Sequence, residues 1–112
     1  DATLYRVTYL ADRARRLIPP ALAPFAADGR WLTEAEERAL GIWRGDRAFG
    51  DAIFLVNPGV QIVPSDMGLK PLGGMHGYDP ADEHSRAAIL STEPVPGYVR
   101  HVADYFKLMT GE

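Results

Sequence analysis

The sequence contains no cysteine among its 112 residues. A chain without thiols forms neither a disulfide nor a thiolate metal site, so a bound metal would need histidine, aspartate or glutamate as ligands. Basic residues are also in short supply, because 12 Lys and Arg face 15 Asp and Glu for a net charge of −3. That balance does not indicate a nucleic-acid-binding surface.

Long apolar runs are missing as well. No run approaches the length of a membrane span, and no segment resembles a signal peptide. The sequence therefore predicts no membrane segment and leaves the cellular compartment undefined. The hydrophobic fraction of 46% and the aromatic fraction of 10% are typical of a globular chain and argue against disorder.

The length predicts a single domain or subdomain over residues 1–112. The chain enters a strand pattern almost at once and begins with aspartate rather than methionine. We therefore expect it to be an excised piece of a larger protein, called the parent below.

Four segments are predicted to be strands. Residues 51–57 form the most apolar one, and the Pro58-Gly59 turn after it predicts a hairpin with a returning strand over 60–63. The other two candidates are residues 4–10, rich in β-branched and aromatic side chains, and residues 86–91.

Helices are predicted between these strands. One begins at Asp12 and ends near residue 18, because two prolines follow it. A second piece covers residues 21–27. Thr33 and Glu36 form a capping box that starts a short helix. That short helix is predicted to stop at Gly41. An amphipathic final helix is predicted over residues 97–109.

The interleaved order of these elements predicts an α/β class, or α+β for the chain in isolation. We expect a three- to four-stranded, mostly antiparallel sheet with helices on one face. A ferredoxin-like arrangement of strand 4–10, helix and hairpin 51–63 fits the order of the elements.

The densest candidate for chemistry is the glycine-rich loop of residues 73–80. It places His76 three residues before Asp79, with Gly74 and Gly77 around the imidazole. Neutral imidazole is a favoured zinc ligand, and glycines allow the backbone to approach an ion closely. The alternative is a loop imidazole that only bonds a backbone carbonyl. His84 and His101 are interpreted as surface residues.

Three runs in order carry a resemblance to a known family. They are residues 50–59, ending in Asn-Pro-Gly, residues 74–80 around His-Gly-Tyr-Asp, and residues 85–90. Together they resemble the C-terminal part of type I phosphodiesterase/nucleotide pyrophosphatase proteins, which belong to the alkaline phosphatase superfamily. The resemblance covers about residues 45–92.

The resemblance implies an alkaline-phosphatase-like parent fold and hydrolysis of phosphate esters at a two-zinc site. It implies that His76 is a ligand of one zinc ion, while Asp79, Gly74 and Gly77 brace the loop. Two metal ions would stabilise the attacking and leaving oxygens. The nucleophile and the remaining ligands of such enzymes precede this motif and are not recognisable in the chain, so we expect it to be inactive and to bind zinc weakly alone.

The partners expected are therefore the rest of the parent catalytic domain and a phosphate-ester substrate. A different class of function is a non-catalytic module that binds a partner, or a second copy of itself as a homodimer, through the edge of hairpin 51–63. A small hydrolase in its own right is the weakest option, because no nucleophile–base pair has a recognisable spacing.

Overall fold

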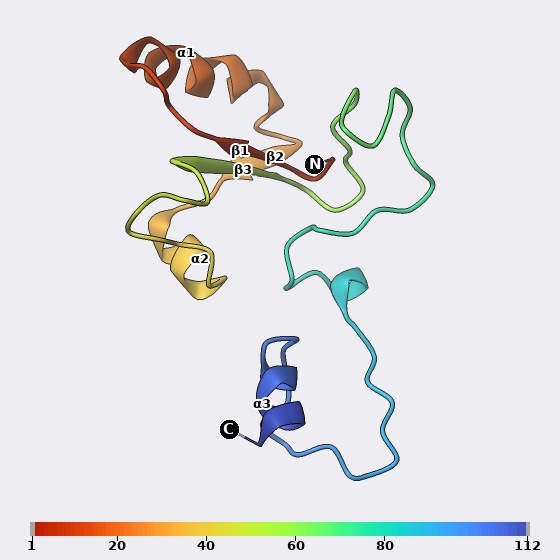
Figure 1. Cartoon of the computed structure of the whole chain (residues 1–112). Coiled ribbons are helices and arrows are strands. Elements are labelled where there is room, and N and C mark those ends of the chain that lie inside the picture. The colour runs from red at the N-terminus through yellow and green to blue at the C-terminus, as the bar shows by residue number, and fades with distance from the viewer. Residues whose placement is uncertain (1, 112) are drawn as a thin grey trace.

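The centre of the fold is a strand that is buried on both faces. The computed structural model describes residues 2–111 and contains one three-stranded antiparallel sheet in the order β1-β3-β2 (Figure 1). Its strands are β1 (Leu4–Val7), β2 (Gly29–Trp31) and β3 (Ala52–Val56). Residues 53–56 of β3 are all buried. A continuous apolar run is what a strand covered on both faces requires.

Helices cover the two faces of this sheet separately. The helix α1 (Asp12–Leu22) and the short 3-10 turn η1 (Ala23–Phe25) lie on one side, where Leu22 and Phe25 share a pocket with Phe54 of β3. On the other side, Leu40, just beyond α2 (Glu34–Ala39), shares a pocket with Ile53. Figure 1 shows α1 and α2 on opposite sides of the sheet. The predicted α+β class and antiparallel sheet are confirmed, with helices on both faces rather than one.

The predicted hairpin 51–63 is wrong, because residues 60–63 form no strand. Both edges of β3 are already paired, one with β1 and one with β2. A returning strand would have no edge of β3 left to bond. Instead the Ile62 amide donates to the carbonyl of Ala2 at the start of the chain. The ferredoxin-like arrangement, which needs that hairpin, is wrong for the same reason.

The strand β2 takes the place of the missing hairpin. It begins at Gly29 and was not predicted from the sequence. A Cβ added at Gly29 would lie 2.6 Å from Cε1 of Phe54 and 2.7 Å from the carbonyl oxygen of Leu55. Glycine therefore allows the two backbones to approach each other closely here.

Helix α1 is longer than predicted, whereas the cap and the end of α2 agree with the prediction. α1 continues through Pro19 and Pro20 to Leu22. Proline φ is compatible with helical geometry, and α1 has no buried residue, so water can reach the carbonyls that lose their amide partner. The capping box of Thr33 and Glu36 is confirmed. So is Gly41 as the left-handed residue after α2, with φ 71°.

The C-terminal part of the chain extends away from the sheet. It contains the 3-10 turn η2 (Glu83–Ser85) and helix α3 (Asp104–Thr110), while the predicted strand 86–91 is absent from the described residues. The helix predicted over residues 97–109 is shorter in the structure, because α3 begins only at Asp104, whose Oδ2 accepts the backbone amides of Arg100 and His101.

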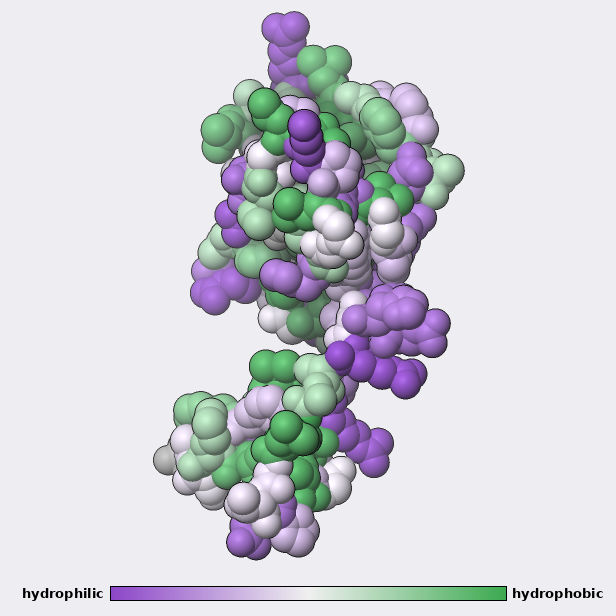
Figure 2. Space-filling model, turned by 90° about the vertical axis from the view of Figure 1, so that its right-hand side faces the viewer, coloured by the Kyte–Doolittle hydropathy of each residue, from purple (hydrophilic) through white to green (hydrophobic). Residues whose placement is uncertain are grey.

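This extension makes the molecule long for its size. The Cα radius of gyration is 17.0 Å, whereas a compact domain of 100 residues has about 13 Å. Apolar side chains appear on the smaller lower part in Figure 2, where the C-terminal residues lie. Leu90 is 97% exposed and Met109 is 78% exposed. Across residues 2–111, no helix has the length and apolar character needed to cross a membrane.

Candidate metal-binding loop

The loop that contains His76 is fixed to the sheet by the residues that follow it. Thr3 Oγ1, just before β1, donates a hydrogen bond of 3.1 Å to the carbonyl of Gly77. The Tyr78 hydroxyl donates to the carbonyl of Val60 at 2.9 Å. A backbone held at two successive residues limits where the His76 side chain can go, although the loop has no regular secondary structure of its own.

The two glycines beside His76 differ in what they do. Gly77 has φ 93°, and a Cβ there would lie 2.8 Å from Oγ1 of the fully buried Thr3. Glycine is needed at this position for both backbone conformation and space. Gly74 has nothing within 4 Å of an added Cβ. The expected bracing role therefore has a visible physical basis at Gly77, and none at Gly74 among the described residues.

Asp79 fixes the far end of the loop. Its Oδ2 accepts from Arg30 Nη2 of β2 at 2.9 Å, and its Oδ1 accepts from the Ala81 amide at 2.9 Å. The same guanidinium bonds Glu36 of the capping box. A network thus runs from the start of α2 through β2 to the loop. With both carboxylate oxygens engaged, Asp79 is placed to support the loop.

The His76 side chain itself is exposed and lies on the wall of an open pocket of about 360 Å³. His84, Asp82 and Arg86 line the same pocket, so the turn η2 comes close to the glycine-rich loop. The sequence interpretation treated His84 as a surface residue, and its side chain is 84% exposed. Among residues 2–111, no group of three or more His, Asp or Glu side chains is arranged to hold a metal ion.

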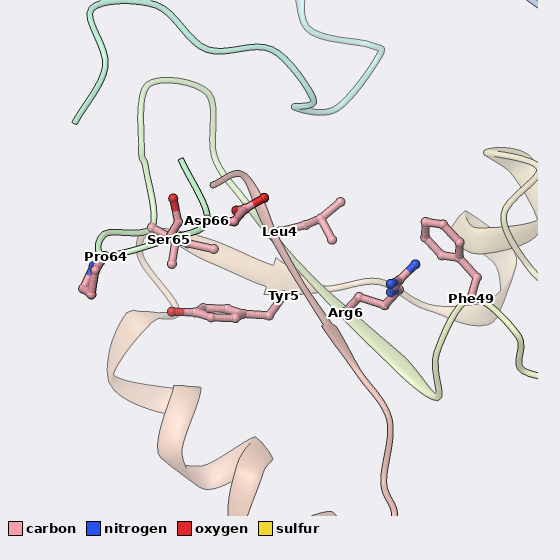
Figure 3. Close-up of a pocket in the computed structure, with 8 residues that line it drawn as sticks. Leu4, Tyr5, Arg6, Phe49, Pro64, Ser65 and Asp66 are labelled. Carbon is pink, nitrogen blue, oxygen red and sulfur yellow. The ribbon is translucent and has the colours of Figure 1, made fainter. Parts of the chain in front are cut away.

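A larger pocket lies elsewhere. It has a volume of about 480 Å³ and follows β1, with the Arg6 guanidinium directed toward Phe49 at one end and Pro64 near Tyr5 at the other (Figure 3). It contains none of the predicted site residues. Its lining combines four apolar side chains with the polar groups of Tyr5, Arg6, Ser65 and Asp66.

The sequence could not have revealed the anchors of the loop. Thr3 and Gly77 are 74 positions apart, and Arg30 and Asp79 are 49 positions apart. Neither pair belongs to a local motif. The only sequence signal for the anchored loop was Gly77, because Gly-Tyr-Asp after a histidine indicates a constrained backbone but does not identify the residue that it contacts.

Comparison with known proteins found no matching family model, no matching curated protein and no matching solved structure. The candidate site offers one exposed imidazole on a tethered loop, with a second imidazole, a carboxylate and a guanidinium around the same pocket.

Proposed function

We propose that His76 supplies one ligand to a zinc site of a phosphodiesterase/nucleotide pyrophosphatase-like hydrolase, and that the other ligands come from outside this chain. The observation that carries the proposal is the exposed imidazole on a loop held at the next three residues. A metal ligand contributed by one segment to a shared site must be accessible, yet positioned before the ion binds.

The surrounding chemistry supports the same assignment. Metal-ligating histidines commonly rely on neighbouring residues that fix the loop or the ring. Here Thr3, Tyr78 and Arg30 hold the backbone and the carboxylate around His76 and leave the imidazole uncommitted to any carboxylate partner among the described residues. Zinc, when bound, would polarise the phosphoryl oxygens and lower the pKa of the nucleophile.

The test is hydrolysis of bis(p-nitrophenyl) phosphate by the complete protein. His76→Ala should lower kcat/KM by about a hundredfold or more, because the loss of a residue that only supports a metal ligand already costs about 10–100-fold. His84→Ala, a second imidazole on the same pocket, is the matched control and should keep most of the activity. Full activity in the His76→Ala protein would refute the ligand assignment.

The isolated chain gives a second, independent test. A single imidazole provides too few donors for a closed zinc site, which takes about four. We expect the 112 residues to bind zinc weakly in a calorimetric titration. Tight, stoichiometric binding that disappears in His76→Ala would contradict the proposal that the other ligands lie outside.

A second candidate function is self-association through the edge of the sheet, but at β1 rather than at the predicted hairpin. The Thr3 carbonyl bonds β3, so by strand alternation the backbone groups of Leu4 and Arg6 point away from β3. They border the pocket of Figure 3. Pairing of two β1 edges should give a homodimer in light scattering that Arg6→Pro abolishes; a monomer at all concentrations would exclude it.

A further inference from the structure

A second pocket, of about 350 Å³, lies beside the His76 pocket and has a different chemistry. It is formed where residues 85–87 meet residues 100–105. The polar side chains on its wall are two arginines, one histidine and two hydroxyl groups, namely Arg86, Arg100, His101, Ser85 and Tyr105. No carboxylate lines it.

This concentration of positive charge is unusual for the chain, which carries a net charge of −3. Among residues 2–111, neither the Arg86 nor the Arg100 guanidinium forms an ion pair with a carboxylate. Two acidic residues, Asp82 and Glu83, lie four and three positions before Arg86, and Asp104 lies four positions after Arg100. The Asp104 Oδ2 accepts the backbone amides of Arg100 and His101 at 2.9 and 2.8 Å. That carboxylate is engaged by the backbone and is not part of the pocket wall.

We propose that this pocket binds a phosphate group. Guanidinium groups present planar pairs of N–H donors that match the oxygens of a phosphate, and such charge-assisted hydrogen bonds are among the strongest that proteins make. The Ser85 and Tyr105 hydroxyls add neutral donors. The proposal does not depend on a zinc role for His76, because it concerns other side chains and needs no metal.

The size of the site favours a small phosphate-bearing molecule over a polymer. A pocket of about 350 Å³ is at the scale of small-ligand sites. A nucleic acid would require a basic surface that extends beyond one pocket, and the overall charge of the chain is acidic. Arg86 also lines the His76 pocket. A phosphate held here would therefore lie next to the proposed metal-binding loop.

The experiment is a titration of the chain with inorganic phosphate at constant ionic strength, followed by amide chemical shifts in NMR spectra. We expect saturable shifts centred on residues 85–87 and 100–105. Arg86→Gln and Arg100→Gln should each weaken binding by about tenfold, which corresponds to about 1.4 kcal/mol. Both side chains are exposed, so the variants should keep the fold. Unchanged chemical shifts for the amides outside the pocket would show that they do.

Arg13→Gln is the matched control, because it removes the same charge from an exposed position in α1, outside the pocket. It should leave phosphate binding unchanged. An equal loss in this control would mean that only net charge matters, and would overturn the site. So would the absence of saturable shifts in the unsubstituted chain, or shifts that appear only elsewhere.

Adenosine monophosphate separates two sources of the phosphate group. If it shifts the same amides and competes with inorganic phosphate, the result supports recognition of a phosphate carried by an organic molecule. Shifts at a different set of amides, with no competition, would contradict recognition of a phosphate carried by an organic molecule and leave free phosphate as the ligand.

Discussion

Replacing Gly77 by alanine should destabilise the protein, whereas the same change at Gly74 should not. Gly77 has φ 93°, a conformation that costs a residue with a Cβ about 1–2 kcal/mol. The new Cβ would lie 2.8 Å from Oγ1 of the buried Thr3. Moving it away would lose the hydrogen bond to the Gly77 carbonyl, worth about 0.5–1.5 kcal/mol. The two effects together give about 1.5–3.5 kcal/mol.

Urea denaturation followed by circular dichroism measures this difference. We expect the midpoint for Gly77→Ala to fall by about 1 M, because the slope for a small domain is about 1–3 kcal/mol/M. Gly74→Ala should change the free energy of unfolding by less than about 0.5 kcal/mol, since its Cβ would meet no atom within 4 Å. Equal midpoints for the two variants would refute the proposed anchoring of the loop through Thr3.

Four further outcomes follow from the geometry. Gly29→Ala should cost about 1–3 kcal/mol in thermal unfolding, because its Cβ would lie 2.7 Å from a carbonyl oxygen of β3; an unchanged melting temperature would contradict the close β2–β3 approach. Thr33→Ala should cost about 1 kcal/mol in urea unfolding through loss of the α2 cap, and no loss would mean that the cap does not stabilise the fold. Hydrogen bonding from the Thr33 backbone and hydroxyl lowers the pKa of Glu36 below its ordinary value of 4.5. The ionised Glu36 carboxylate therefore contributes fully to the free energy of unfolding above pH 4.5, and this contribution is lost as the pH falls through the lower pKa of the folded protein. Glu36→Gln should flatten this part of the curve of stability against pH, and an unaltered curve would refute the role of Glu36. Asp79→Asn breaks an exposed ion pair with β2 and should change global stability by only about 0–1 kcal/mol, so a much larger loss would show that the loop supports the core.

The elements that local sequence determines were predicted well. The apolar run of β3, the start of β1, the capping box at Thr33 and the left-handed Gly41 all depend on residues within a few positions of each other. The physical causes there are side-chain burial, an amide acceptor at a helix start, and a backbone conformation that suits glycine.

The elements that depend on residues distant in sequence were predicted poorly. The apolar run of β3 predicted a buried strand, yet the Pro58-Gly59 turn suggested that its neighbour would be residues 60–63. The three-residue β2 is too short for any periodicity to reveal it. The prolines in α1 were overruled because the helix lies at the surface.

For the candidate site, the sequence indicated the constrained loop but not its anchors. Gly77 and Asp79 were expected to brace it, and the structure supplies their partners in Thr3 and Arg30. The role of His76 as a metal ligand stays a prediction. It depends on the chemistry of the imidazole and on ligands beyond this chain, which no local pattern specifies.

Zinc content is the most direct test of the central claim. The complete protein and its His76→Ala and His84→Ala variants would be purified without chelators, and bound zinc counted by plasma mass spectrometry. The proposal predicts two zinc ions for the unsubstituted protein and His84→Ala, and the loss of one from His76→Ala. Two tightly bound zinc ions in His76→Ala would contradict it.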